Sequence, residues 1–256
     1  MGIFREFAFR TWYWIVSNID KNAEVLLMNY GYSDDKQIVK LKPEDEINRY
    51  SIQLYHLLAS KVELKNKHLV EIGCGRGGGL SYCVKTFSPK TTLGVDLNNT
   101  AIKFCIKHYS SQAGLTFMQG DSQALNLENE SFDVVLNVES SHRYLQFDKF
   151  IAEVNRILHQ GGYFLFTDFR NTNQLNELED CIEQSNFAII EKSMITHNVV
   201  KALELDDKRR RDLVDKLVPV YLQGIALNFA GVIGSGIYNQ FVSEEVTYFV
   251  YVLQKK

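Results

Sequence analysis

A glycine-rich segment directly after a short apolar run limits the fold of this chain more than any other feature. The run His68–Ile72 leads into Gly73-Cys74-Gly75-Arg76-Gly77-Gly78. Glycines at such a turn let the backbone approach a ligand closely, and the following helix presents its amino end to that ligand. The glycine spacing also satisfies the dinucleotide pattern G-x-G-x-x-G, which by itself is weak evidence for a ligand class. The segment therefore predicts a strand, a ligand-binding turn and a helix, in that order.

Apolar runs and helical patterns alternate around and beyond this turn. We expect strands at 68–72, 91–97, 115–119, 132–138 and 163–167, separated by helices that include 80–87, 100–109 and 147–158. This alternation predicts βαβ units and a parallel sheet. The later chain adds a helix at 175–183, a strand at 188–196, a mixed helical stretch at 199–241 and a last strand at 245–253. A terminal strand after a long insertion indicates a late antiparallel strand on a mostly parallel sheet.

The first part of the chain does not follow this rhythm. We interpret residues 1–60 as an N-terminal cap of two or three helices over the carboxyl edge of the sheet, where such folds bind ligands. Residues 61–256 then form the α/β domain, with a lid insertion over about residues 197–243. The stretch Leu217–Ser243 has no charged residue, but Pro219 and its glycines and amides favour a lid over a membrane span.

Composition excludes several partners. The formal net charge of −3 gives no electrostatic footprint for a polyanion, so we do not expect a nucleic acid partner. The four cysteines form no C-x-x-C pair, which predicts reduced thiols and no metal site. The N-terminus has no signal-peptide pattern, so we expect a cytoplasmic protein that is not transmembrane.

Acidic residues stand at or near the ends of the first three predicted strands. Glu71 lies two residues before the first glycine, near the place where a methyltransferase anchors the amino-acid end of its cofactor. Asp96 closes the second strand, where a carboxylate accepts both ribose hydroxyls in dinucleotide enzymes and methyltransferases alike. Gly120-Asp121 closes the third strand, where an acidic side chain receives the adenine amino group. Glu71, Asp121 and the late antiparallel strand favour a methyltransferase that uses S-adenosylmethionine, with an NAD-linked reductase as the minor alternative.

With these motifs the chain resembles class I methyltransferases of Rossmann-like fold. More closely, it resembles the phthiotriol/phenolphthiotriol dimycocerosate methyltransferases and related lipid and fatty-acid O-methyltransferases. The stretches that carry the closer resemblance cover nearly the whole chain: Trp12-Tyr13-Trp14, Asn29-Tyr30-Gly31-Tyr32, Glu46–Tyr55, the glycine-rich segment, Phe132–Tyr144, Arg211–Asp215 and the strand near Tyr248.

The resemblance implies S-adenosylmethionine as cofactor, S-adenosylhomocysteine as product and a cofactor site along the strand ends. Glu71 and the first two glycines are expected to line the methionine end, Asp96 to hold the ribose and Asp121 to address the adenine. Asn137 is expected to face the cofactor, and Tyr55 to close over its carboxylate. The full predicted set is Tyr55, Glu71, Gly73, Cys74, Gly75, Asp96, Leu97, Asp121, Ser122 and Asn137.

The predicted general base lies in the loop after the fourth strand, Asn137-Val138-Glu139-Ser140-Ser141-His142. Methyl transfer is an in-line displacement, so the protein must chiefly align the acceptor with the methyl carbon. A hydroxyl acceptor also needs a base near pH 7, and neutral histidine suits that role. We predict that His142 is this base, with Glu139 either orienting it or shaping the pocket. A structural loop cap is the alternative for His142.

Acceptor-side residues are predicted more loosely. Asp168, at the end of the fifth strand, either contacts the acceptor or caps its loop. Tyr30 and Tyr32 belong to an aromatic N-terminal region, and His197 opens the predicted lid insertion. A cap this apolar admits a lipid, polyketide or aromatic acceptor more readily than a charged metabolite. Reversible contact of Met1–Ile19 with a membrane and a homodimer both remain open.

Several chemistries are compatible with these motifs. The leading prediction is O-methylation of a hydroxyl or carboxyl on a small lipid-like or natural-product acceptor. N- or C-methylation of a small molecule is the nearest alternative. Further alternatives are non-methyl-transfer chemistry, such as a cyclisation, on a fold that binds S-adenosylmethionine, and an inactive binding module. Asn137 and Asp168-Phe169 stand where metal-requiring catechol methyltransferases carry acidic ligands, so no metal is expected.

Overall fold

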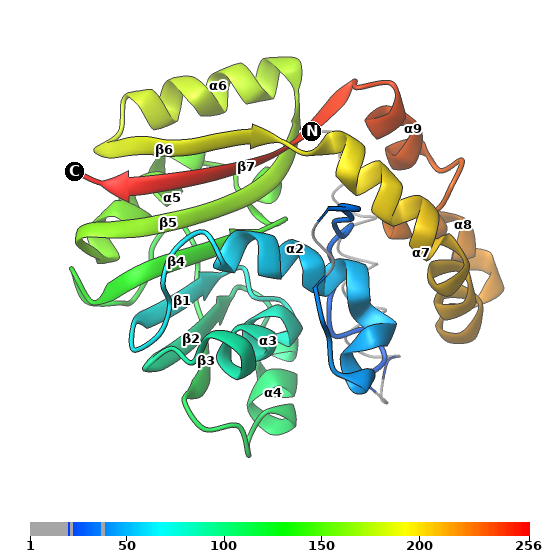
Figure 1. Cartoon of the computed structure of the whole chain (residues 1–256), viewed down its shortest axis with the longest axis horizontal. Coiled ribbons are helices and arrows are strands. Elements are labelled where there is room, and N and C mark those ends of the chain that lie inside the picture. The colour runs from blue at the N-terminus through cyan, green and yellow to red at the C-terminus, as the bar shows by residue number, and fades with distance from the viewer. Residues whose placement is uncertain (1–19, 21–22, 37–38) are drawn as a thin grey trace.

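A seven-stranded sheet forms the centre of the molecule (Figure 1). The computed structural model describes Asp20, residues 23–36 and residues 39–256. The strand order is β3-β2-β1-β4-β5-β7-β6, and β7 runs antiparallel to both of its neighbours. The strands are β1 (His68–Ile72), β2 (Thr91–Asp96), β3 (Leu115–Gln119), β4 (Phe132–Val138), β5 (Leu158–Asn171), β6 (Phe187–Met194) and β7 (Val246–Lys255). The predicted mostly parallel sheet with a late antiparallel strand is confirmed.

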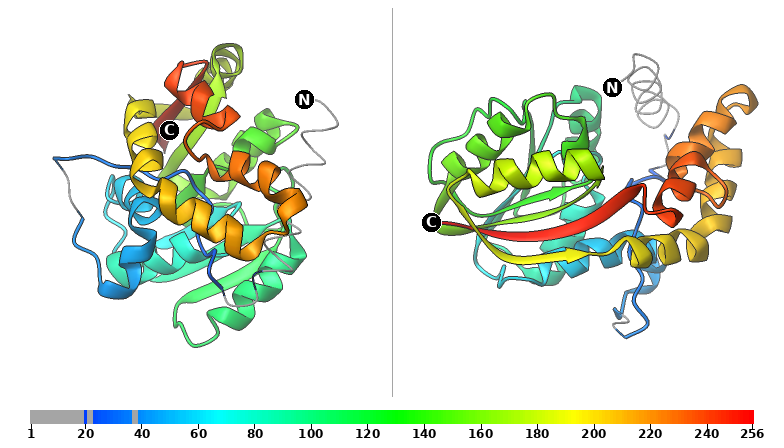
Figure 2. Two further views of the ribbon diagram at one scale, coloured as in Figure 1. Left: turned by 90° about the vertical axis from the view of Figure 1, so that its right-hand side faces the viewer. Right: turned by 90° about the horizontal axis from the view of Figure 1, so that it is seen from above.

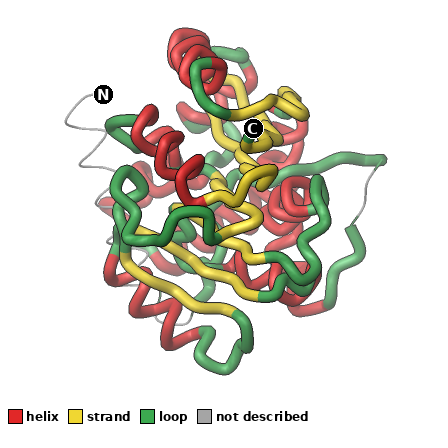
Figure 3. Tube along the Cα trace, turned by 90° about the vertical axis from the view of Figure 1, so that its left-hand side faces the viewer, coloured by secondary structure: helices red, strands yellow, loops and turns green. Residues whose placement is uncertain are grey.

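Helices cover both faces of this sheet (Figure 3). Their bounds are η1 (Pro43–Asn48), α2 (Arg49–Ala59), α3 (Gly78–Phe87), α4 (Asn99–His108), η2 (Ser141–Arg143), α5 (Phe147–Ile157), α6 (Thr172–Glu183), α7 (Thr196–Leu217), α8 (Val220–Ala230) and α9 (Gly236–Val242). One apolar core cluster joins β-strand side chains to α2, α3, α7 and α9. A second cluster joins the opposite sheet face to α5 and α6. The central strands β1, β4 and β5 are therefore largely buried on both faces, which explains their nearly continuous apolar sequences.

Helices α7, α8 and α9 form the predicted insertion between β6 and β7. Both views in Figure 2 place them beyond the carboxyl ends of the parallel strands. Among the described residues, no helix is long and apolar enough to cross a membrane. The uncharged stretch Leu217–Ser243 begins at the last residue of α7 and contains α8 and α9. Pro219 immediately precedes α8.

The fifth strand differs from the prediction. We expected Gly161-Gly162 to end the preceding helix and the strand to begin at Tyr163, but β5 begins at Leu158 and contains both glycines. Leu158 pairs with Phe132 and Tyr163 pairs with Val134, so extra residues are accommodated as an irregularity in the strand. Gly161 has a φ of +76°, a conformation that glycine adopts without steric cost.

The N-terminal region also differs from the prediction. Of the expected helical cap, η1 and α2 lie within the described residues, while residues 23–33 are not helical. We call residues 23–33 the strap. Gly31 has a φ of +88°, and a Cβ there would lie 3.0 Å from Tyr50 Cβ, so this position cannot continue a helix. The aromatic stretch at residues 1–19, including the predicted membrane contact, lies outside the described residues.

Candidate active site

The glycine-rich loop between β1 and α3 is tied to the end of β2. The backbone N–H groups of Gly73 and Cys74 donate to Val95 O at 2.7 and 3.0 Å. Gly75 N donates to Asp96 Oδ2 at 2.8 Å. Gly73 has a φ of +78°, and a Cβ built there would lie 2.3 Å from Ser140 Oγ. The loop after β4 therefore packs directly against the glycine-rich loop.

Glu71 is fully buried beside this loop and has one oxygen without a partner. Tyr55 of α2 donates from its hydroxyl to Glu71 Oε1 at 2.6 Å. The other oxygen, Oε2, is buried and has no hydrogen-bond partner among the described residues. Burial raises the pKa of Glu71 to about 8, although the hydrogen bond from Tyr55 acts against this shift. A carboxyl group with an open acceptor oxygen is suited to a ligand that carries N–H donors.

The ends of β2 and β3 present two further acidic residues. Asp96 accepts from Asn98 N at 2.8 Å through Oδ1, in addition to its bond with Gly75. Leu97, beside it, leaves 68% of its surface exposed, which is unusual for leucine and offers an apolar face at the strand end. Asp121 is exposed and Ser122 is buried in the turn after β3. All of these residues reach the same edge of the sheet.

A polar network links the end of β4 to the glycine-rich loop. The Asn137 amide donates from Nδ2 to Ile72 O at 2.8 Å and to Ser140 Oγ at 2.7 Å. Tyr144 OH lies 2.9 Å from Ser140 Oγ. Asn137 Oδ1 is buried and has no hydrogen-bond partner among the described residues. The ten predicted cofactor residues thus lie around one edge of the sheet. Tyr55 belongs to α2 and reaches this edge through its hydrogen bond to Glu71.

His142 and Asp168 form a hydrogen-bonded pair at the ends of β4 and β5. His142 Nδ1 lies 2.8 Å from Asp168 Oδ1, and His142 N donates to Asp168 Oδ2 at 2.9 Å. The imidazole stacks on Phe169 with ring centroids 4.5 Å apart. The hydrogen bond to the carboxylate places the proton of a neutral imidazole on Nδ1 and its lone pair on Nε2.

The charges around this pair favour a neutral imidazole. Asp168 is fully buried, and burial alone would raise its pKa. His142, Arg170 and the hydroxyl of Ser141 instead hold the pKa of Asp168 below its usual range. Burial lowers the pKa of His142, and the attraction of Asp168 opposes this shift without reversing it. Arg170 Nη1 lies 3.2 Å from Asp168 Oδ2, so the carboxylate is neutralised without a charge on His142.

Glu139 does not orient His142. Its Oε1 accepts from Tyr30 N at 2.6 Å and from the hydroxyl of Tyr248. Glu139 has a φ of +47°, a left-handed conformation that is uncommon outside glycine, asparagine and aspartate. The chain turns at this residue, so Glu139 joins the strap to β7 while Asp168 holds the imidazole. The predicted role of Glu139 in shaping the pocket stays a prediction.

Replacing Glu139 with glutamine should change how stability depends on pH. Burial raises the pKa of Glu139 to about 8, above its ordinary value of 4.5. The stabilisation from its protonated form is complete below the unfolded value and is lost as pH rises through about 8. The wild type should therefore lose about 2 kcal/mol more than Glu139→Gln between about pH 6 and pH 8. Denaturant unfolding of both proteins at several pH values measures this difference, and parallel curves would contradict it.

The predicted acceptor-side residues are dispersed. Tyr30 packs against Phe169 with centroids 5.6 Å apart and against Phe241 at 5.4 Å, so it lies one ring from His142. The hydroxyl of Tyr32 donates to Asp34 Oδ2 at 3.3 Å, on the side of α2 and η1. His197 is exposed in the first turn of α7. Tyr30 and Asp168 therefore lie at the site around His142, whereas Tyr32 and His197 make none of these contacts.

Two residues to which the sequence analysis assigned no role, Ser141 and Arg170, hold Asp168 in place. The hydroxyl of Ser141 donates to Asp168 Oδ2 at 2.7 Å, and Arg170 Nη2 donates to Ser141 Oγ at 2.7 Å. Arg170 follows Asp168 by two residues on one strand, so both side chains lie on the same face. That spacing was the available signal. Cys74 is buried, and burial raises the pKa of its thiol, so the thiol is not activated as a nucleophile.

No group of three or more histidine, cysteine, aspartate or glutamate side chains is placed to hold a metal ion in the part of the chain that the structure describes.

Known proteins share this arrangement over most of the chain. The methyltransferase domain family matches residues 70–166. The fatty-acid O-methyltransferase of Mycolicibacterium smegmatis is 42% identical over 204 residues, 79% of this chain and 74% of that protein. A phthiotriol/phenolphthiotriol dimycocerosates methyltransferase of Mycobacterium tuberculosis is 36% identical over 247 residues, 96% and 91% of the two chains. The solved cyclopropane synthase MmaA2 of Mycobacterium tuberculosis is similar with a TM-score of 0.75 at 11% identity, covering 95% of this chain and 98% of that one.

Proposed function

This chain belongs to the methyltransferase family that includes the fatty-acid and phthiotriol/phenolphthiotriol dimycocerosates methyltransferases, and we propose that it methylates an oxygen atom of a lipid-like acceptor with S-adenosylmethionine as donor. The observation that carries the proposal is the His142–Asp168 pair, joined by a hydrogen bond of 2.8 Å and lying at the strand ends beside the glycine-rich loop. The pair and the loop meet because Ser140 packs against Gly73.

The residues at the sheet edge fit this cofactor. Glu71 Oε2 is a buried acceptor that has no partner among the described residues and is suited to the ammonium group of the methionine end. Asp96 uses one lone pair on each oxygen for a backbone N–H and retains capacity for the ribose hydroxyls. Exposed Leu97 and the Asp121-Ser122 turn provide an apolar face and polar groups for an adenine ring. Bound there, S-adenosylmethionine supplies an electrophilic methyl group on sulfur.

The protein's part in the transfer is alignment and proton removal. The cofactor, held by Glu71 and Asp96, would supply the methyl group to the acceptor oxygen, and the electron pair of the broken carbon–sulfur bond would stay on the sulfur of the departing S-adenosylhomocysteine. The hydroxyl proton moves to His142 Nε2, because the Asp168 carboxylate keeps the other ring nitrogen protonated. Asp168 then stabilises the imidazolium that forms, while Arg170 keeps the carboxylate ionised. A neutral base of this kind favours a hydroxyl acceptor, since a carboxylate has no proton to remove.

Tyr30, Phe169, Phe241 and Tyr248 make the surroundings of the pair aromatic and apolar. These contacts favour an acceptor whose reacting oxygen is attached to a hydrocarbon. The proposal covers the lipid-like acceptor class and leaves the individual substrate to experiment.

The test pairs a long-chain alcohol with the fatty acid of the same length. The purified protein is incubated with S-adenosylmethionine and each acceptor, and S-adenosylhomocysteine and methylated lipid are quantified by mass. We expect an ether or an ester product, with the alcohol showing dependence on His142. Tight cofactor binding without any methylated lipid would contradict the proposal and favour the non-methyl-transfer alternative.

A further inference from the structure

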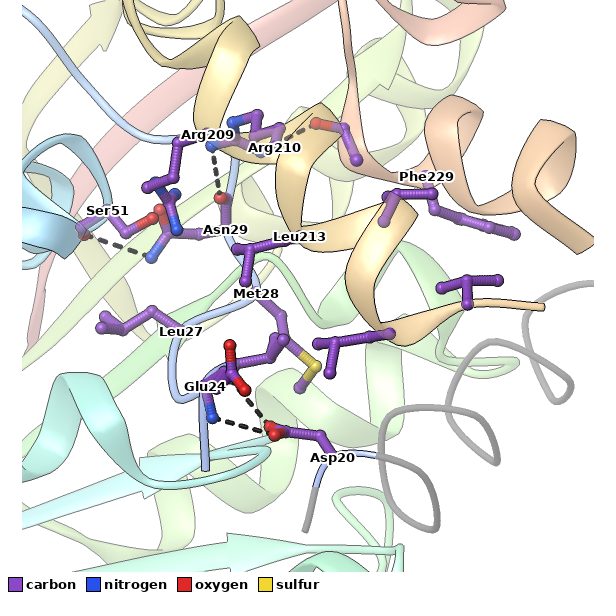
Figure 4. A pocket seen from close by; sticks show the side chains of 15 residues that line it. Asp20, Glu24, Leu27, Met28, Asn29, Ser51, Arg209, Arg210, Leu213 and Phe229 are labelled. Atoms are coloured by element: carbon purple, nitrogen blue, oxygen red, sulfur yellow. Dashed lines mark hydrogen bonds between the residues drawn. The ribbon is translucent and has the colours of Figure 1, made fainter. Parts of the chain in front are cut away.

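A cavity lies between the strap and the insertion helices α7 and α8 (Figure 4). Its free space is about 730 Å³, open solvent at the mouth included. Most of its wall is apolar, contributed by Val25, Leu27, Met28, Leu213, Val214, Leu217, Val218, Phe229 and Ala230.

Each charged residue of this wall has an ion-pair partner within the protein. Asp20 pairs with Arg76 at 3.2 Å, and Glu24 pairs with Lys216 at 2.7 Å. Asp206 accepts from the other two charged wall residues, Arg209 and Arg210. The apolar side chains make up the rest of the wall, and a hydrocarbon chain gains from burial against them.

One polar atom of the wall is left without a partner. The Asn29 amide donates from Nδ2 to Ser51 O at 3.2 Å, and its Oδ1 is buried without a hydrogen-bond partner among the described residues. Asn29 is only 5% exposed, so a ligand rather than bulk solvent is suited to satisfy this oxygen. A single hydroxyl donor on an otherwise apolar ligand matches the wall.

The cavity shares its strap wall with the active site. Met28 lines the cavity, and its Cε would lie 2.8 Å from a Cβ on Gly75 in the glycine-rich loop. Tyr30 follows Asn29 and contacts Phe169, on which His142 stacks. Strap side chains thus contact the cavity on one side and residues of the reaction centre on the other, and methionine is flexible enough to be displaced by a chain.

We propose that this cavity holds the hydrocarbon chain of the acceptor, so that Leu213 and Leu217 set the chain length that the enzyme accepts. This inference rests on the proposed function for the role of the chain, because the reacting oxygen must reach His142 while the tail lies between the strap and α7. The ligand class is a long-chain lipid, and a polar hydrogen on its chain, apart from the reacting oxygen, would find an acceptor in Asn29 Oδ1.

The test reduces the free space of the cavity with a larger side chain on α7. Leu213→Trp places a larger side chain in the wall, and Leu205→Trp is the matched control, because Leu205 lies on the same helix, is 54% exposed and does not line the cavity. Binding of the fluorescent long-chain fatty acid cis-parinaric acid is titrated without cofactor. We expect Leu213→Trp to weaken this binding by about tenfold or more and Leu205→Trp to leave it unchanged. Binding of S-adenosylhomocysteine shows that each variant is folded, and Leu217→Trp replaces Leu213→Trp if the latter is not.

Turnover separates this inference from the proposed function. With octanol and octadecanol as acceptors, the filled cavity should raise KM for the long alcohol alone. If the variant binds cis-parinaric acid like the wild type and keeps its chain-length preference, the inference is overturned. If no alcohol or acid is methylated by the wild type but the filled cavity still loses cis-parinaric acid, the proposed function fails and the lipid cavity stands.

Discussion

Replacing His142 with alanine is expected to lower kcat for a hydroxyl acceptor by about 10²–10⁴-fold, the usual contribution of general acid–base catalysis. The variant removes the nitrogen that receives the hydroxyl proton. Cofactor affinity should be retained, because the imidazole contacts Asp168 and Phe169 rather than the glycine-rich loop. Release of S-adenosylhomocysteine at saturating acceptor measures the rate, and calorimetry with the same product measures affinity.

The acceptor and the pH together identify the role of this residue. A carboxylate acceptor is already deprotonated at neutral pH, so His142→Ala should methylate a fatty acid nearly as fast as the wild type. For a hydroxyl acceptor, wild-type kcat/KM should be flat at neutral pH and fall below pH 6.5, because burial lowers the pKa of His142 from its ordinary 6.5. His159→Ala, at the opposite end of β5, is the control. An unchanged rate with the alcohol would remove His142 from the mechanism.

Gly73→Ala is expected to weaken binding of S-adenosylhomocysteine by about 10²-fold or more, a loss of roughly 3 kcal/mol. A Cβ at Gly73 would lie 2.3 Å from Ser140 Oγ and 2.9 Å from Tyr144 OH. Either the glycine-rich loop or the loop that carries His142 must move to admit it. Both lie against the proposed cofactor site, so affinity should fall more than stability does. Calorimetry of the product and thermal unfolding of the free protein measure the two effects.

Gly114→Ala is the control for Gly73→Ala, because it adds the same backbone strain without steric crowding of the new Cβ. Gly114 has a φ of +77°, close to that of Gly73, but a Cβ there has nothing within 4 Å. We expect this control to cost about 1–2 kcal/mol of stability and to leave product binding unchanged. Equal affinities for the two variants would show that the contact between Gly73 and Ser140 does not matter for binding.

The strands were predictable because each parallel strand is a short apolar run between breaking residues. The predicted bounds of β1, β3 and β4 match the structure. The start of β5 was wrong because Gly161-Gly162, read locally, indicates a turn. Only the pairing of Leu158 with Phe132 and of Tyr163 with Val134 shows that the glycines lie inside the strand. Such pairing depends on a neighbouring strand and leaves no local sequence signal.

The candidate site was predictable where it follows from strand ends. Glu71, Asp96 and Asp121 reach one edge because parallel strands point the same way. The partner of His142 was not predictable, because it depends on which of two carboxylates the loop after β4 faces. The left-handed backbone at Glu139 turns that side chain toward Tyr30 and Tyr248, and Asp168 on the neighbouring strand takes its place.

The strap contacts both halves of the site. Met28 lies against Gly75 of the glycine-rich loop, and Arg210 of α7 donates to Asn29 O and Tyr30 O at 3.2 and 3.0 Å. In the proposed complex, the cofactor and the acceptor would therefore contact opposite sides of one short segment. A shift of that segment by either ligand changes the affinity for the other by a factor that is the same in both directions. A mutation that raises the affinity for the methyl donor is consequently expected to change the affinities for lipids as well, even if the mutated residue does not contact the lipid.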